Sequence, residues 1–72
     1  MHMELGNQIR RLRFEQGEMS QQELADSIGV SRMTIYSIEK GKYTPSTLLA
    51  LKLAQVFNTT VEHIFFIKSS ED

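Results

Sequence analysis

The sequence of 72 residues contains no cysteine, so neither a disulfide framework nor a thiolate metal site can hold the fold together. A chain this small also has too little surface to bury in two separate cores, which excludes a second domain. Stability must therefore come from the packing of secondary structure in one core. The lack of cysteine is consistent with a reducing compartment.

Long apolar runs are missing as well. No stretch approaches the roughly 20 apolar residues that cross a bilayer, and the start lacks the basic and then apolar order of a secretory signal. We therefore expect a cytoplasmic protein with no membrane partner. Met1 and His2 resemble an expression remnant, which would put the natural start at Met3; a native extension is the other interpretation.

The chain has almost no net charge, but its acidic and basic residues are unevenly distributed along the sequence. The formal net charge is −1, so the composition does not by itself indicate a nucleic-acid partner. Basic residues gather in the middle of the chain with only Glu39 among them: Arg32, Lys40, Lys42 and Lys52. An acidic stretch precedes them, with Glu15, Glu18, Glu23 and Asp26. We expect one basic face and one acidic face.

Apolar spacing and capping residues predict a compact all-α fold of five helices. The pattern of Ser20 followed by Glu23 is a capping box, which marks a helix start, and Thr44 before Pro45 marks another. The expected helices cover about residues 5–16, 21–28, 32–40, 45–57 and 61–65. They form one domain over residues 3–68, residues 65–68 could extend into a strand, and residues 69–72 are expected to be a disordered tail.

Residues 21–40 have the spacing of two short helices joined by a tight turn. Ala25 is small enough to let the helices cross closely, and Gly29 supplies a backbone angle that other residues resist. Ile35 and Ile38 turn inward, whereas the next set points away from them on a helical wheel: Met33, Tyr36, Ser37 and Lys40. Such a unit places its second helix in the DNA major groove.

At this point the sequence resembles the Cro and lambda-repressor type of helix-turn-helix, the xenobiotic-response-element family of bacterial and phage regulators. The matching segments are IRRLR at 9–13, MSQQELA at 19–25, GVS at 29–31, Ile35, IEKGK at 38–42 and Pro45. The resemblance covers nearly the whole chain. It implies a lambda-repressor-like domain whose residues 32–40 read bases.

Carried over by position, the resemblance implies two sets of DNA contacts. Bases would be read by Arg32, Met33, Tyr36 and Ser37. Arginine can bind guanine with two hydrogen bonds and methionine can pack on a thymine methyl, whereas Tyr36 could equally cover the rim of the core. Phosphates would be bound by Gln21, Thr34, Lys40, Lys42 and Tyr43. Met33 departs from the glutamine or asparagine that many members place there.

Other polar residues receive structural roles. Arg13 and Glu39 lie near the inner edges of their helices, and the resemblance suggests that they form an ion pair between them. Arg10 and Arg11 are expected to be solvated. His63 has no second histidine within helical reach, so we expect no metal site and no cofactor.

The expected fourth helix is apolar on nearly all sides, which calls for two buried faces. One face closes the core, and the other could form a two-fold dimer contact. The candidates for that contact are Leu49, Val56, Phe65, Phe66 and Ile67. The alternative is a thicker core, with Phe65 and Phe66 folded back over the first helix.

The expected function is that of a transcription regulator, a repressor that binds double-stranded DNA at a near-palindromic operator as a homodimer. The alternative is a protein-interaction module, an antitoxin or adaptor that uses its apolar C-terminal surface to bind a different chain as protein partner. An enzyme is not expected, because the sequence has no nucleophile triad, phosphate-binding loop or paired carboxylates.

Overall fold

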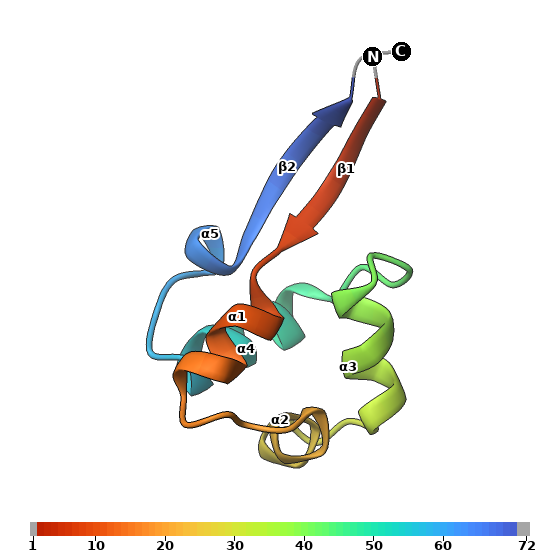
Figure 1. Ribbon diagram of the computed structural model, residues 1–72. Helices are drawn as coiled ribbons and strands as arrows, with labels where there is room; N and C mark the ends of the chain where they lie inside the picture. Colours follow the sequence, from red (N-terminus) through yellow and green to blue (C-terminus); the bar gives the residue numbers. More distant parts are fainter. Residues whose placement is uncertain (1, 71–72) are drawn as a thin grey trace.

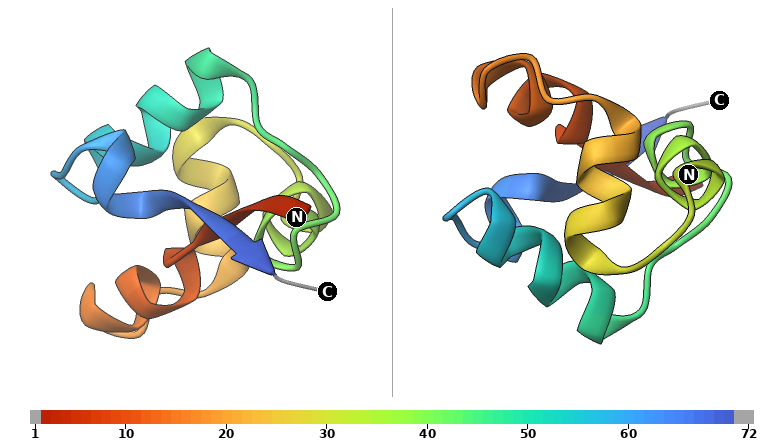
Figure 2. Two further views of the ribbon diagram at one scale, coloured as in Figure 1. Left: turned by 90° about the horizontal axis from the view of Figure 1, so that it is seen from above. Right: turned by 90° about the horizontal axis from the view of Figure 1, so that it is seen from below.

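The computed structural model describes residues 2–70, in which a cluster of helices carries a projecting pair of strands (Figure 1). In chain order the elements are β1 (His2–Asn7), α1 (Ile9–Glu15), α2 (Gln21–Ile28), α3 (Arg32–Glu39), α4 (Thr47–Val56), α5 (Val61–Ile64) and β2 (Phe65–Ser70). Two further views show the strands side by side, with the helices arranged around their base (Figure 2). No helix among the described residues is long and apolar enough to span a membrane.

The prediction of an all-α fold is wrong in one respect, because the two ends of the described chain form an antiparallel sheet. Leu5 pairs with Ile67, and Asn7 pairs with Phe65. The predicted first helix therefore starts too early, since Leu5 lies in β1 and α1 begins at Ile9. Ser69 and Ser70, expected in a disordered tail, lie in β2, and residues 71–72 fall outside the described part. We call this two-stranded sheet the ribbon.

Gly6 is needed where the ribbon leaves the helices. It is buried and stands opposite Phe66, and a Cβ atom at Gly6 would lie 2.7 Å from Cζ of the Phe66 ring and 2.8 Å from Cδ of Lys68. Both distances are well below van der Waals contact. The ring of Phe66 therefore packs on the bare glycine backbone across the two strands.

Replacing Gly6 with alanine is expected to lower the free energy of unfolding by about 1 kcal/mol, because the ring of Phe66 must move off the backbone. The measurement is urea unfolding of Gly6→Ala in the wild-type and Phe66→Ala backgrounds. Without the ring the alanine has room, so its cost should shrink in the second background. An equal cost in both backgrounds would show that this contact is unimportant.

Local capping explains the two helices of the helix-turn-helix. Ser20 Oγ accepts a hydrogen bond from the Glu23 backbone N–H at 2.9 Å, and a Glu23 carboxylate oxygen accepts one from the Ser20 N–H at 2.8 Å, which confirms the predicted capping box. Gly29 ends α2 with φ at 77°, a left-handed angle that favours glycine. Ser31 then caps α3 through the Thr34 N–H. The turn is thus set by residues adjacent in sequence.

The predicted start of the fourth helix is wrong by two residues. Ser46, rather than Thr44, caps α4, and its Oγ accepts from the Leu49 N–H at 3.1 Å. Pro45 therefore stays in the connecting segment. Within α4, Leu49 and Leu53 turn inward and are buried.

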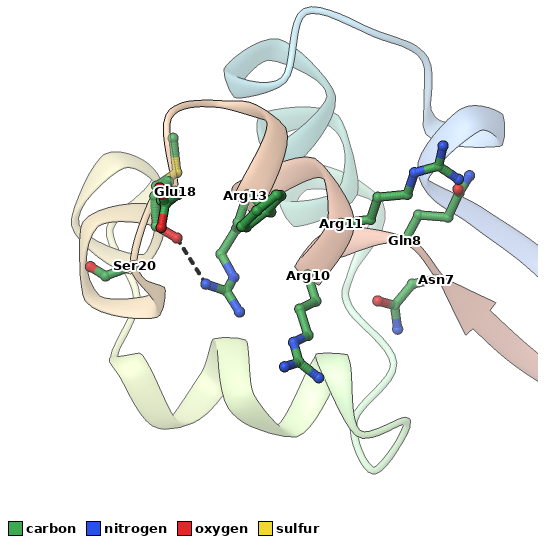
Figure 3. Close-up of a pocket in the computed structure, with 9 residues that line it drawn as sticks. Asn7, Gln8, Arg10, Arg11, Arg13, Glu18 and Ser20 are labelled. Carbon is green, nitrogen blue, oxygen red and sulfur yellow. Dashed lines mark hydrogen bonds between the residues drawn. The ribbon is translucent and has the colours of Figure 1, made fainter.

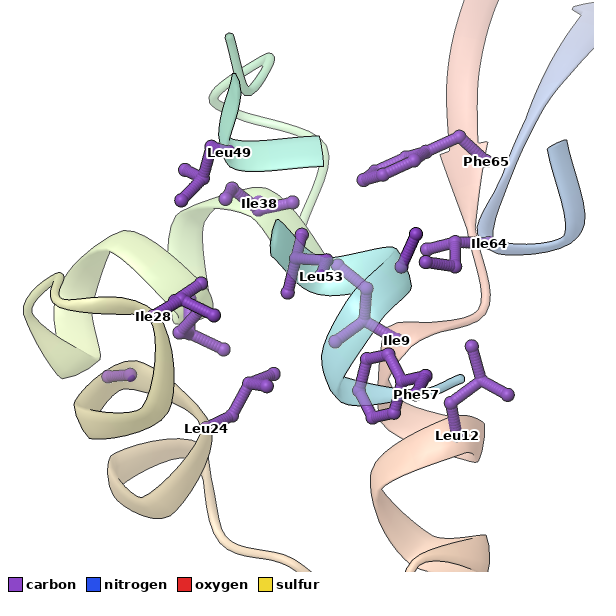
Figure 4. Packing of buried hydrophobic residues seen from close by; sticks show 13 residues of the cluster. Ile9, Leu12, Leu24, Ile28, Ile38, Leu49, Leu53, Phe57, Ile64 and Phe65 are labelled. Atoms are coloured by element: carbon purple, nitrogen blue, oxygen red, sulfur yellow. The ribbon is translucent and has the colours of Figure 1, made fainter. Parts of the chain in front are cut away.

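One apolar core joins all five helices. Its buried members are Ile9, Leu12, Leu24, Ala25, Ile28, Ile35, Ile38, Leu49, Leu53, Ala54, Phe57, Ile64 and Phe65. Figure 4 shows Leu53 at the centre of this cluster. Ile35 and Ile38 bring α3 into the same core, so the core fixes the helix that carries the candidate site.

Candidate nucleic-acid interface

The outer side of α3 presents the side chains that the sequence assigns to base reading. Ile35 and Ile38 are buried against the core, and the opposite side of the helix exposes Arg32, Met33 and Tyr36. Met33 is 60% exposed, an unusual position for an apolar side chain unless something covers it. Residues three and four apart share a helix face, so Met33 and Tyr36 form one continuous exposed surface.

Ser37 and Thr34 lie deeper than the other expected contacts. Both are half-buried, and the Thr34 hydroxyl lies 3.1 Å from the Ser31 hydroxyl. Together with their neighbours they line a shallow depression of about 290 Å³ formed by Ser31, Met33, Thr34, Ser37, Lys42 and Tyr43. Ser37 is therefore within reach of a group that enters this depression, with Met33 and Tyr43 beside it.

The exposed charge of the segment from Ser31 to Ser46 is entirely positive. Between Ser31 and Ser46 the sequence holds one carboxylate, Glu39, whose side chain is 9% exposed and bound to Arg13. The exposed ionised groups of this stretch are Arg32, Lys40 and Lys42. Although the net charge of the whole chain is near zero, the outer side of α3 is therefore basic.

The end of α3 places two of these cations. Gly41, at φ 77°, allows the Gly41 N–H to bond to the Ile38 carbonyl and the Lys42 N–H to bond to the Ser37 carbonyl, a Schellman motif. Lys40 Nζ lies 5.7 Å from the centre of the Tyr36 ring, within range of a cation–π contact. Tyr36, Lys40 and Lys42 are thereby held on the outer side of the same turn.

Arg13 and Glu39 form an ion pair between α1 and α3. Arg13 Nε donates to Glu39 Oε2 at 2.7 Å and Nη2 donates to Oε1 at 3.2 Å, while Nη1 donates to the Met19 carbonyl at 2.8 Å (dashed line in Figure 3). The Arg13 and Glu39 side chains are 14% and 9% exposed. The pair is thus largely buried and joins two helices, as a structural role requires.

Gln21 also belongs to this network. Its Nε2 donates to Glu39 Oε1 at 3.1 Å, so the side chain expected to contact phosphate is engaged inside the protein. An amide nitrogen carries a second N–H, which leaves one donor for an outside acceptor. The contact ties the first residue of α2 to the last residue of α3.

Asn7 is a polar residue that the sequence analysis missed. Its Nδ2 donates to the Ile38 carbonyl at 3.0 Å, and its Oδ1 accepts from the Ile9 N–H at 3.1 Å. Asparagine is favoured at helix starts, and this preference was a usable signal. It was hidden by assigning residues 5–16 to a single helix.

Arg10 and Arg11 differ in what they contact. Arg11 Nε lies 3.1 Å from Glu15 Oε2 in an exposed ion pair within α1. Arg10 has no ion pair among residues 2–70 and extends toward α3 (Figure 3). Exposed Phe14 lies with both arginines along a depression of about 680 Å³ beside α1. His63 is exposed, and no group of three potential metal ligands occurs in the described part of the chain.

The five candidate dimer residues separate into different environments. Leu49 and Phe65 are buried in the core and so are unavailable to a second chain, and Val56 is half-buried against it. Phe66 is exposed on the ribbon face that covers Gly6, whereas Ile67 is 67% exposed on the face shared with Leu5. Of the five, only Phe66 and Ile67 stand out from the monomer.

Comparison with known proteins agrees with this arrangement. The sequence matches the helix-turn-helix family over residues 9–64. An uncharacterized HTH-type transcriptional regulator of Archaeoglobus fulgidus is 49% identical over 63 residues, or 88% of this chain and 89% of that protein. The uncharacterized HTH-type transcriptional regulator YgzD of Bacillus subtilis is 42% identical over 62 residues, 86% of this chain and 92% of YgzD.

A third relative is the competence pilus inhibition repressor of Acinetobacter baylyi, 36% identical over 70 residues, which cover 97% of this chain and 63% of the repressor. The relatives come from archaea as well as bacteria, which is wider than the bacterial and phage origin that the sequence suggested. The family match spans all five helices and the surface around α3. The chain therefore belongs to the helix-turn-helix transcriptional regulators of the Cro and lambda-repressor type.

Proposed function

We propose that this protein is a sequence-specific repressor that binds a near-palindromic operator as a homodimer, with α3 in the major groove. The observation that carries the proposal is the outer face of α3, which is exposed, basic and free of exposed carboxylates between Ser31 and Ser46. DNA carries phosphates along both edges of the major groove, so a basic helix face without exposed carboxylates is attracted into the groove. Arg32 lies at one end of α3, where it can reach bases, and Lys40 lies at the other, beside the phosphates.

The roles divide by position along α3. Arg32 donates to the two major-groove acceptors of guanine, and Met33 packs on a thymine methyl. Ser37 and Tyr36 contact base edges farther along the helix. Lys40, Lys42 and Tyr43 bind phosphate, which sets the register of the protein on the duplex. Gln21 and Thr34 donate their remaining N–H and O–H groups to the phosphate backbone of the DNA.

A repressor is favoured over other regulators for two reasons. The described chain is filled by the DNA-binding fold, so occupancy of the operator is the simplest way to act on transcription. One relative is named a repressor, and it aligns with nearly all of this chain. Occupancy blocks polymerase when the operator overlaps a promoter.

The homodimer rests on an apolar surface away from α3. Leu5 and Ile67 face each other across the ribbon on one side, and Leu5 borders a shallow groove of about 210 Å³ together with Leu51 of α4. Leu5, Leu51 and Ile67 are all exposed. A surface of this kind suits a two-fold contact, because each copy offers the same uncharged side chains to the other.

Selection of bound sequences from random duplex DNA, followed by titration of the winner, tests DNA reading. Arg32→Ala is expected to cost about 1–3 kcal/mol in binding and to relax preference at one base pair of each half-site. The control Lys42→Ala should weaken binding to all sequences and reduce the dependence of affinity on salt by about one unit of slope. If no sequence is enriched and binding is weak even at low salt, the proposal fails and a protein partner becomes the better explanation.

Ile67→Glu is expected to convert the homodimer to a monomer, because the charge would be buried between two copies. Size-exclusion chromatography with light scattering measures the mass at several concentrations. Ser27→Glu adds the same charge to the exposed side of α2 and should leave the mass unchanged. A monomeric wild type at high concentration would remove the dimer from the proposal.

A further inference from the structure

Asn7 joins three elements through one side chain. It is the last residue of β1, its Oδ1 accepts from the first N–H of α1, and its Nδ2 donates to the Ile38 carbonyl in the last turn of α3. The side chain is half-buried. In Figure 3 it stands at the start of α1, on the side that faces α3.

The position of Asn7 is itself fixed by its neighbours. The Gln8 N–H donates to the Ile64 carbonyl at 2.9 Å, and Gln8 Nε2 donates to the His63 carbonyl at 2.7 Å. Asn7 also pairs with Phe65 at the base of the ribbon. The backbone that carries the Asn7 Nδ2 donor is therefore fixed by contacts with α5 and β2.

The C-terminal turn of α3 is held at two consecutive residues. Asn7 binds the carbonyl of Ile38, and Arg13 binds the carboxylate of Glu39. The base-reading residue Arg32 lies at the opposite end of this helix, seven residues before Glu39 and thus about 10 Å away at 1.5 Å per residue. If the Asn7 contact is lost, Arg13 still holds Glu39, and a tilt of about 10° around that residue would move Arg32 by about 2 Å, more than a hydrogen bond tolerates.

Phosphate contacts respond differently to such a tilt. Lys40 and Lys42 lie beside the held end and move little, and a long, flexible lysine tolerates small shifts of its backbone. Loss of the Asn7 contact would thus impair base reading more than phosphate binding. Sequence preference and general affinity for DNA become separable at this one residue.

We propose that Asn7 is a positioning residue for α3, which sets the angle of the helix in the groove and thereby the DNA specificity without touching DNA. The expected effect of Asn7 on DNA specificity rests on the proposed function. The contact to Ile38 itself can be tested in the free protein.

Asn7→Asp separates this role from helix capping. Aspartate keeps the oxygen that accepts from the Ile9 N–H, and a negative charge is favourable at a helix start. It replaces the Nδ2 donor with a carboxylate oxygen that repels the Ile38 carbonyl. The variant should therefore keep α1 intact while it removes one of the two contacts at the end of α3, and Arg13 still holds Glu39.

The first measurement is amide hydrogen exchange of the full chain without DNA. In Asn7→Asp the amides of Lys40 and Gly41, which bond to the Tyr36 and Ile38 carbonyls, should exchange about tenfold faster. The amide of Leu12 in α1, bonded to the Gln8 carbonyl, should be unchanged. Gln55→Glu is the matched control, since it makes the same change from amide to carboxylate at an exposed residue of α4.

The second measurement compares a selected operator with unrelated duplex DNA. The ratio of the two affinities should fall about tenfold in Asn7→Asp, while the affinity for unrelated DNA stays within about twofold of the control. If the amide exchange and the affinity ratio of Asn7→Asp equal those of Gln55→Glu, the proposal is overturned. Faster exchange throughout the chain would also overturn it, because Asn7 would then only stabilise the fold.

The two proposals fail in distinguishable ways. If the wild type binds all DNA alike, the proposed function is refuted, and with it the effect of Asn7 on specificity. The exchange of Lys40 and Gly41 then decides alone whether Asn7 holds α3. If the wild type prefers its operator over unrelated DNA and Asn7→Asp keeps the same preference, the proposed function stands and the positioning role is refuted.

Discussion

Arg13→Ala is expected to lower the free energy of unfolding by about 3–5 kcal/mol, because it strands the largely buried carboxylate of Glu39. Gln21 would be left as the one side chain bonded to that carboxylate in the described structure. A domain of 72 residues has a total stability of about 4–11 kcal/mol, so this loss is a large share of the total. Urea unfolding followed by circular dichroism measures the loss.

The exposed pair of Arg11 and Glu15 provides the control. Arg11→Ala removes an arginine from the same helix, whose Nε lies 3.1 Å from a carboxylate oxygen, but the Arg11 and Glu15 side chains are 72% and 54% exposed. Pairs of this kind contribute about 0–0.5 kcal/mol. If Arg13→Ala cost no more than Arg11→Ala, the buried network would have no role in holding α3.

Leu53→Ala should have the second largest effect, a loss of about 2–5 kcal/mol in the free energy of unfolding. Leu53 is fully buried at the centre of the core, and its truncation leaves a cavity among side chains from other helices (Figure 4). The helices packed against α4 are α2 and α5, which contribute Leu24, Ile28 and Ile64 to the same core, so the cavity can close only if these helices shift. Urea unfolding at low protein concentration gives the value.

Leu51→Ala makes the same change two residues earlier on α4. Leu51 is 52% exposed, so its truncation should cost less than about 1 kcal/mol in the monomer. Its effect should grow with protein concentration if the apolar surface with Leu5 and Ile67 forms the dimer. Equal losses at Leu51 and Leu53 would contradict the inward direction of Leu53.

The sequence was sufficient to predict those elements whose boundaries are set by neighbouring residues. Ser20 with Glu23 and the left-handed Gly29 mark the helix-turn-helix boundaries because each acts on a residue within a few positions of itself. The same holds for the outer side of α3, which follows from helical spacing once Ile35 and Ile38 are placed inside. These elements are the ones that carry the candidate interface.

The expectation that residues 65–68 could extend into a strand is confirmed by β2, but β1 and its pairing could not be predicted in the same way. Leu5 fits the helical spacing of Ile9 and Leu12, and the evidence against that helix lies in Phe66 and Ile67 at the other end of the chain. The inward face of α4 was equally hidden, since a helix apolar on all sides has no preferred direction. Leu49 was therefore assigned to a second chain although it belongs to the core.

The ribbon also imposes an order on folding. β1 is synthesised first and β2 last among the described elements, so β1 has no partner until almost the whole domain has been made. Contacts between such distant segments close a long loop and form late, whereas the capped helices can form as soon as they emerge. During synthesis Asn7 would then precede its ribbon partner Phe65 by nearly the length of the domain. If Asn7 orients α3 as proposed, α3 acquires its final orientation only when the ribbon closes, so the order of synthesis would delay sequence-specific binding until the domain is complete.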